Sequence, residues 1–288
     1  PFVLAAYYLL AKLGAALYSS ADGVPYFWPA NSLLVAALCF SVRRQWAALI
    51  LGVALTELLL DVGMDMPWLA SSGIAIANAL ESVLAAYLLR TFVGDPPRLQ
   101  HWKQLWRFVV LIVIACPAAS AFLGAAALTG AGIAPSYVHA WYAWWVGDAL
   151  GLLLVLPALL TLPRLAALFH RRLSGVRMLE AMFIVGAGPV MMFYDRANVP
   201  DAAELQSYFL LPFVVWLALR FHPAATAWAN LAIACGSVQI HGLGQGAGPF
   251  SAVSTELHTF AIQTSLFVIA LTAAALAALV AERRHALL

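Results

Sequence analysis

Ionisable and amide side chains stand inside long apolar stretches of this chain, where burial is expensive. Each ionisable group costs roughly 2.5–3.5 kcal/mol when it enters a bilayer. Near the middle of apolar stretches lie Lys12, Glu57, Asn78, Glu81 and Asp148, with Asn31 and Asn230 at shallower or less certain depth. One cation and three carboxyl groups cannot all stay charged there without further partners. We therefore expect some of the carboxyl groups to be neutral or linked to water.

These residues allow three interpretations: a structural network that fixes helix register, a ligand or ion pocket, or a proton pathway. Asn78 and Glu81 are three residues apart and share one face of a helix. The glycines beside Asp148 allow a close approach of helices. Trp144 and Trp145 lie about one turn from Asp148. Such rings are typical of an interfacial belt, but some of them could wall an aromatic pocket over Asp148.

The chemistry of the remaining polar residues is less specific. His139, His241 and His258 lie near one predicted rim and could bind haem or a transition metal. Their spacing is not local, so we interpret them as scattered interfacial histidines and predict no cofactor. The chain lacks the Gly-x-Ser-x-Gly, His-Glu-x-x-His and Walker motifs. We therefore predict no catalytic residue in this segment.

The composition indicates that lipid surrounds most of the chain. The chain is 64% hydrophobic and only 10% charged, whereas soluble domains are about 25% charged. This excludes a soluble enzyme, and the formal net charge of +2 gives no basic surface for nucleic acid. The apolar runs predict an all-α polytopic membrane protein of about ten transmembrane helices. They cover residues 2–20, 27–42, 46–62, 68–90, 105–130, 138–162, 178–195, 205–220, 223–241 and 257–281.

The basic residues predict the orientation of these helices. All Lys and Arg residues except Lys12 and Arg196 fall in alternate connections or in the tail. Connections rich in Lys and Arg stay in the cytoplasm. We therefore expect both termini to be cytoplasmic, and the acidic, turn-rich connections to face outward.

Several segments together resemble the first class of the MASE-type membrane-associated sensor domains. They are Phe27–Asn31, Ile76–Glu81, Trp144–Gly151 with Pro157, Leu211–Phe221 and Ala281–Arg284. The resemblance covers essentially the whole chain and implies a bacterial inner-membrane sensory module that detects an unknown stimulus. It further implies a cytoplasmic histidine kinase or a cyclic-di-GMP enzyme as the output. The positions that it favours for function are Asn78, Glu81, Trp145 and Asp148.

The last predicted span suits transmission of a signal. It is rich in alanine, including Ala274 and Ala278, and leaves the membrane at Glu282 without a Gly or Pro stop. Small residues favour close packing, here between two copies in a homodimer. We expect residues 1–288 to form one integral-membrane sensory domain with an output domain beyond residue 288. The alternatives are a last helix that is only an anchor and, for the whole chain, a small-solute transporter with a midplane polar site.

Overall fold

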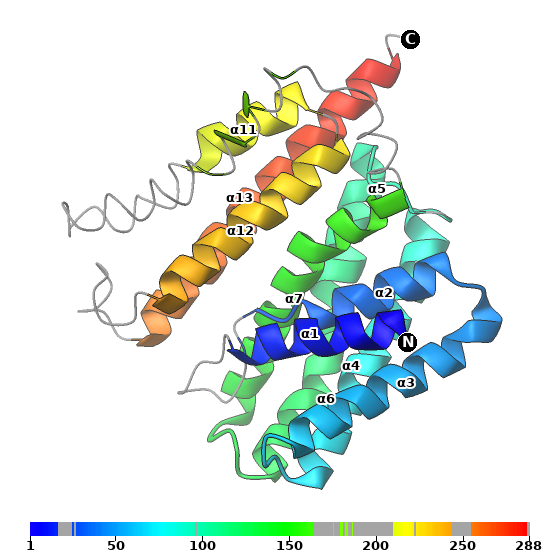
Figure 1. Cartoon of the computed structure of the whole chain (residues 1–288), viewed down its shortest axis with the longest axis vertical. Helices are drawn as coiled ribbons and strands as arrows, with labels where there is room; N and C mark the ends of the chain where they lie inside the picture. The colour runs from blue at the N-terminus through cyan, green and yellow to red at the C-terminus, as the bar shows by residue number, and fades with distance from the viewer. Residues whose placement is uncertain are drawn as a thin grey trace. The chain divides into compact units, whose positions relative to one another are not determined.

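The computed structural model describes residues 1–16, 25, 27–95, 97–163, 175, 179–180, 182–183, 186, 210–221, 223–243 and 255–286. These residues form helices and connections and contain no strand (Figure 1). The predicted all-helical class is therefore confirmed for the part of the chain that is described.

The helices follow the predicted apolar runs closely. They are α1 (Phe2–Ala16), α2 (Ala30–Phe40), α3 (Arg43–Val62), α4 (Trp68–Leu88), η1 (Leu89–Val93), α5 (Trp102–Arg107), η2 (Phe108–Ala115), α6 (Cys116–Gly130), α7 (Tyr137–Leu160), α11 (Leu210–Arg220), α12 (Pro223–Leu243) and α13 (Thr255–Ala286). The predicted span at 178–195 lies almost wholly outside the described residues. The span at 223–241, which Asn230 interrupts, forms one continuous helix, α12.

Several of these helices are suited to cross a membrane. Five are long and apolar enough: Arg43–Val62, Trp68–Val93, Trp102–Gly130, Tyr137–Leu160 and Gln263–Arg283. Shorter apolar helices include α2, whose 11 residues extend only about 16 Å, against a hydrocarbon core of about 30 Å. The structure thus confirms a multi-pass helical protein, while the predicted number of ten spans stays a prediction.

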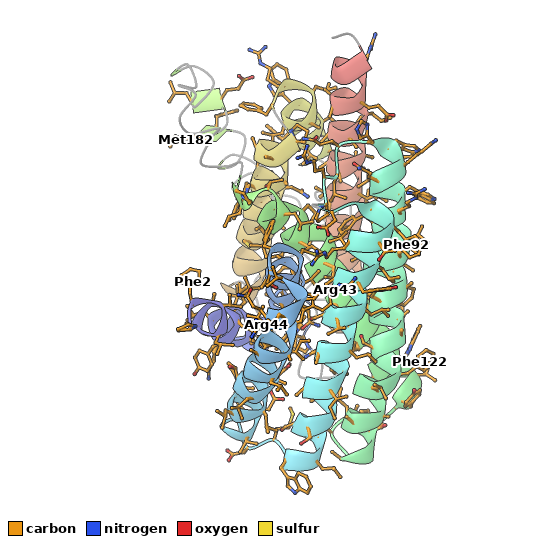
Figure 2. The ribbon with its side chains drawn as sticks, turned by 90° about the vertical axis from the view of Figure 1, so that its right-hand side faces the viewer. Phe2, Arg43, Arg44, Phe92, Phe122 and Met182 are labelled. Atoms are coloured by element: carbon orange, nitrogen blue, oxygen red, sulfur yellow. The ribbon has the colours of Figure 1, made fainter. Side chains whose placement is uncertain are left out.

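Large apolar side chains point outward along the long helices. Phe2, Phe92 and Phe122 project from the ribbon in Figure 2, and Leu51 is 70% exposed. Soluble proteins rarely expose so much contiguous apolar surface. Lipid is the solvent that makes this surface favourable.

The described chain divides into two compact units. Unit 1 comprises residues 1–98 and 106–159, and unit 2 comprises residues 99–105 and 160–288. In unit 1, α4 packs against α6, α3 and α2, and its small residues face the tightly packed core. In unit 2, α13 packs against α11 and α12 around a core that includes Leu217, Phe221 and Ile269.

The helix from Trp102 to Gly130 widens into a π-helical turn, η2, just before Pro117. Proline has no N–H to donate and crowds the carbonyl one turn earlier, so the ladder cannot remain regular there. The Cys116 N–H and Sγ both donate to the Leu111 carbonyl, five residues back. The Trp145 indole N–H on α7 donates to the Ile114 carbonyl at 3.0 Å. These bonds satisfy backbone carbonyl groups to which lipid cannot donate hydrogen bonds.

Candidate functional site

A buried polar cluster lies at the centre of unit 1. The Tyr7 hydroxyl on α1 donates to Glu57 Oε2 on α3 at 3.1 Å. Asn31 Nδ2 on α2 donates to Asn78 Oδ1 and to Glu81 Oε1 on α4, both at 3.0 Å. Asn78 Nδ2 in turn donates to Glu57 Oε1. Residues from four helices are therefore joined by direct side-chain hydrogen bonds.

Two more helices join this cluster through Glu81. The Ser120 hydroxyl on α6 donates to Glu81 Oε2 at 2.6 Å, and Ser120 is 1% exposed. The Asp148 carboxyl on α7 lies close to Glu81. Two carboxyl groups can share a hydrogen bond only if one of them holds a proton. The Glu81–Asp148 pair thus carries at most one negative charge when that bond is formed.

The start of α2 is held against α7 by backbone contacts. The Trp28 N–H donates to the Gly147 carbonyl at 3.2 Å, and the Ser32 hydroxyl donates to the Gly151 carbonyl at 2.9 Å. A Cβ at Gly151 would collide with the Trp28 carbonyl oxygen, so only glycine allows this approach. The prediction that a glycine beside Asp148 permits close packing is therefore confirmed for Gly151.

A cavity of about 70 Å³ lies beside the cluster. It lies toward the end of unit 1 where α3 joins α4, because Met64 and Met66 of that connection line it. Its polar walls come from Asp61, Asn78 and Asp148, and its aromatic walls from Trp28 and Trp144. This volume accommodates a few water molecules or one small solute.

Four of the residues around the cavity carry a buried polar atom without a hydrogen-bond partner in the described part of the chain. These atoms are Trp28 Nε1, Asp61 Oδ2, Trp144 Nε1 and Asp148 Oδ2. The Trp144 indole lies near Asp148 but does not reach hydrogen-bond geometry. Buried polar groups are normally satisfied, and such a group costs about 1–3 kcal/mol when it is not. The gathering of these groups around one cavity points to an occupant with polar atoms.

The cluster is rich in acids and holds no cation in the part of the chain that the structure describes. Glu57, Asp61, Glu81 and Asp148 are all at least 95% buried. The prediction that Lys12 belongs to the polar core is wrong. Its side chain is exposed, and its ammonium lies 5.9 Å from the centre of the Tyr8 ring. Lys12 is on the outer face of α1, whereas Tyr7 occupies the inner face.

The two tryptophans of the α7 motif have different roles. Trp144 lines the cavity, and its ring packs on Gly124, where an added Cβ would lie 2.5 Å from the indole. Trp145 does not line the cavity, because its indole is bonded to the Ile114 carbonyl and stacks near Trp141, 5.3 Å between ring centres. The alternative of a pocket wall thus suits Trp144, and Trp145 instead supports the π-helical turn.

The residues predicted for transmission have separate environments in unit 2. Ala274 is half-buried, but Ala278 is fully buried against residues of its own chain. The expectation that Ala278 faces a second copy is therefore wrong. Glu282 is exposed, and its Oε2 accepts the Trp102 backbone N–H at 3.1 Å. A carboxylate at the first residue of α5 also complements the positive end of that helix.

The histidine hypothesis finds no grouped ligands among the described residues. His139 lies on the exposed face of α7, and the side chains of His241 and His258 fall outside the described part of the structure. In the same part of the chain no three His, Cys, Asp or Glu side chains are grouped to hold a metal ion. The haem or metal option stays an untested alternative to the prediction of no cofactor.

Sequence reasoning missed Tyr7, Asp61, Ser120 and Trp28. Tyr7 and Ser120 carry hydroxyl groups that are common in membrane helices, so neither is unusual by type. Asp61 occupies the last turn of α3, close to the end of the predicted span 46–62. Its spacing of four residues from Glu57 is the signal that could have found it, because this spacing places both carboxyl groups on one helix face.

A comparison with known families identifies the class of protein. Residues 1–284 match the model of the MASE1 family, and the chain belongs to this family of membrane-associated sensor domains. The family consists of sensor domains of signalling proteins and gives no support to the transporter alternative. No match to the chain was found among curated proteins or among solved structures.

Proposed function

We propose that this chain is the sensing module of a bacterial inner-membrane signalling protein, and that the cavity beside the polar cluster is its sensing site. The module detects a small ligand and passes the signal through α13 to a cytoplasmic histidine kinase, diguanylate cyclase or cyclic-di-GMP phosphodiesterase. The observation that carries this proposal is the cavity itself. Within a sensor-family domain, it gathers four unpartnered buried polar atoms beside a hydrogen-bonded acidic cluster.

A physical route for transmission is supported by one helix. Ser120 on the helix Trp102–Gly130 bonds to Glu81 in unit 1. At the other end of that helix, within unit 2, the Trp102 N–H bonds to Glu282 of α13. An occupant that alters the Glu81–Asp148 pair changes the position of Ser120 and hence of its helix. A ligand acts in this way only if it binds two states with different affinity.

The topology that we propose has ten spans with both termini in the cytoplasm. Its support is the placement of Arg43, Arg44 and Arg90 at the ends of α3 and α4 that lie away from the cavity. Arg90 follows α4, forms an exposed ion pair with Asp95 at 2.6 Å and donates to the Ser41 carbonyl at 3.3 Å. With these residues in the cytoplasm, the cavity faces the outer side of the membrane.

We further propose that the signalling protein is a homodimer in which α13 is the helix that moves. Ala278 is occupied within its own chain, so the exposed Leu279 is a better contact for a second copy. If α13 continues as one helix into the output domain, the rotation of that helix about its axis sets the signalling output.

Insertions test this proposal in the full-length protein. Two residues inserted after Arg284 rotate the downstream helix by about 200°, whereas seven residues nearly restore its phase. The two-residue insertion is expected to change basal output much more than the seven-residue control. Equal output from both insertions at equal membrane abundance would mean that α13 is a passive tether.

A further inference from the structure

The chemistry of the cavity walls defines the class of occupant. We infer that the cavity binds a small protonated amine that also carries a neutral oxygen acceptor, such as a hydroxyl or carbonyl group. This inference rests on the proposed sensing function, whose ligand it specifies.

Charge is the first argument. Asp61 and Asp148 line the cavity, and Glu57 and Glu81 lie directly behind them. Among the described residues no Lys or Arg side chain lines the cavity or bonds to these four carboxyl groups. An anion entering here would meet carboxyl oxygens and no cation from the described part of the chain. An ammonium group would meet the free oxygens of Asp61 and Asp148 and form charge-assisted hydrogen bonds.

The aromatic walls support a cation as well. Trp28 and Trp144 line the cavity, and indole is the ring that attracts cations most strongly. The thioethers of Met64 and Met66 complete a soft, polarisable wall. Gly124 leaves no free space behind the Trp144 ring, so this ring is fixed before a ligand arrives.

The indole nitrogens specify the second group of the ligand. Trp28 Nε1 and Trp144 Nε1 are buried donors without a partner in the described chain. An amine has no acceptor for them once it is protonated. A neutral oxygen near the ammonium group would accept these bonds, and it would avoid the repulsion that a carboxylate or phosphate meets beside the acidic cluster.

Three small probes separate these contributions. Ethanolamine has both groups, ethylamine lacks the oxygen, and glycolate keeps a hydroxyl but is an anion. Their binding is measured by calorimetry and thermal unfolding with the full-length protein in nanodiscs of phosphatidylglycerol, which has no amine. We expect saturable binding of ethanolamine, several-fold weaker binding of ethylamine and no binding of glycolate. A parallel set of discs containing phosphatidylethanolamine shows whether the same amine on a lipid headgroup competes.

Variants place the binding at the cavity. Asp148→Asn is expected to weaken ethanolamine binding at least about tenfold because an amide cannot form the carboxylate that pairs with the ammonium group, whereas the exposed Asp95→Asn is a matched control without effect. Trp144→Phe keeps an aromatic ring but removes the N–H, and should reduce the preference for ethanolamine over ethylamine. If Asp148→Asn does not fold, the probe series on the wild-type protein and the Trp144→Phe variant still test the ligand class.

The outcomes distinguish this inference from the proposed function. Binding of glycolate as tight as that of ethanolamine, or no binding of any probe up to about 10 mM, would overturn the ligand class. If the amines fail to bind but Asp148→Asn still alters signalling output, the sensing function stands without this ligand. If ethanolamine binds and output never responds, the ligand class stands and the sensing function fails.

Discussion

Each acid in the polar cluster is tolerated because its oxygens face donors from other helices. Glu81 is the best example, since Asn31 and Ser120 each donate to a different oxygen of its carboxyl group. Loss of Glu81 would leave these donors buried without a partner. The energetic role of the cluster therefore depends on acceptor geometry more than on charge.

A pair of substitutions at Glu81 tests this view. Glu81→Gln keeps the shape and an acceptor for Asn31, and the Ser120 hydroxyl can rotate to accept from the new amide. We expect little change in unfolding temperature. Glu81→Leu should cost about 1–3 kcal/mol for each donor left unpaired. Thermal unfolding of the purified protein measures both, with Ser72→Ala on the exposed side of α4 as the control. Equal stability of the Gln and Leu variants would contradict this account.

The neighbouring tryptophans give a second comparison. Trp144→Phe removes a buried N–H that has no partner in the described chain, and the relief of its desolvation offsets the packing that the smaller ring loses. Trp145→Phe removes the bond to the Ile114 carbonyl and should cost about 1 kcal/mol. Thermal unfolding of both variants under the same conditions shows which substitution costs more stability. A larger loss for Trp144→Phe than for Trp145→Phe would contradict this order.

Much of the site could be predicted at this scale. Depth in an apolar run identified Glu57, Asn78, Glu81 and Asp148, because a buried acid or amide must find partners. The same reasoning misplaced Lys12. Depth along a helix does not say which face a residue occupies, and a long cationic side chain can lie on the outer face.

At the scale of elements, the start of α2 determines how the site is built. α2 begins at Ala30, and the extended backbone before it packs against α7 rather than against lipid. Irregular backbone at membrane depth is tolerated only where it is buried in protein. Gly151 supplies the space for that burial.

Alanine substitution of two glycines tests this contact. Gly151→Ala should sharply reduce folded yield and unfolding temperature, because its Cβ collides with the Trp28 carbonyl oxygen, which cannot move aside as a side chain would. Gly130→Ala, at the end of α6, meets no atom within 4 Å and should be neutral or stabilise by about 0.5–1 kcal/mol. Wild-type stability of Gly151→Ala would mean that α2 and α7 are not in direct contact.

The sequence predicted the helices themselves better than their irregularities. Apolar length located the boundaries of α3, α4 and α7 within a few residues. It could not show that α2 is short, because Phe27–Pro29 is as apolar as the helix that follows. The sequence also did not indicate the π-helical turn of η2, although Pro117 marks the point where the helical hydrogen bonds must change.

At the scale of the molecule, the distribution of charge along the helices predicts the orientation of unit 1. Reporter fusions after Arg44 and Arg107 should report the cytoplasm, and a fusion in the connection at residues 63–66 should report the outer side. The same fusions locate the mouth of the cavity, since Met64 and Met66 line it. An outer signal at Arg107 would contradict the proposed ten-span topology.

The central claim is that the cavity beside the polar cluster controls the output of a signalling protein. The most direct measurement is the signalling output of the full-length protein carrying Asp148→Asn, compared with wild type and with Asp95→Asn at equal membrane abundance. The account predicts that Asp148→Asn shifts basal output or abolishes the response to stimulus, while Asp95→Asn behaves as wild type. Wild-type output and response from Asp148→Asn would show that the cavity is only a structural feature of the fold.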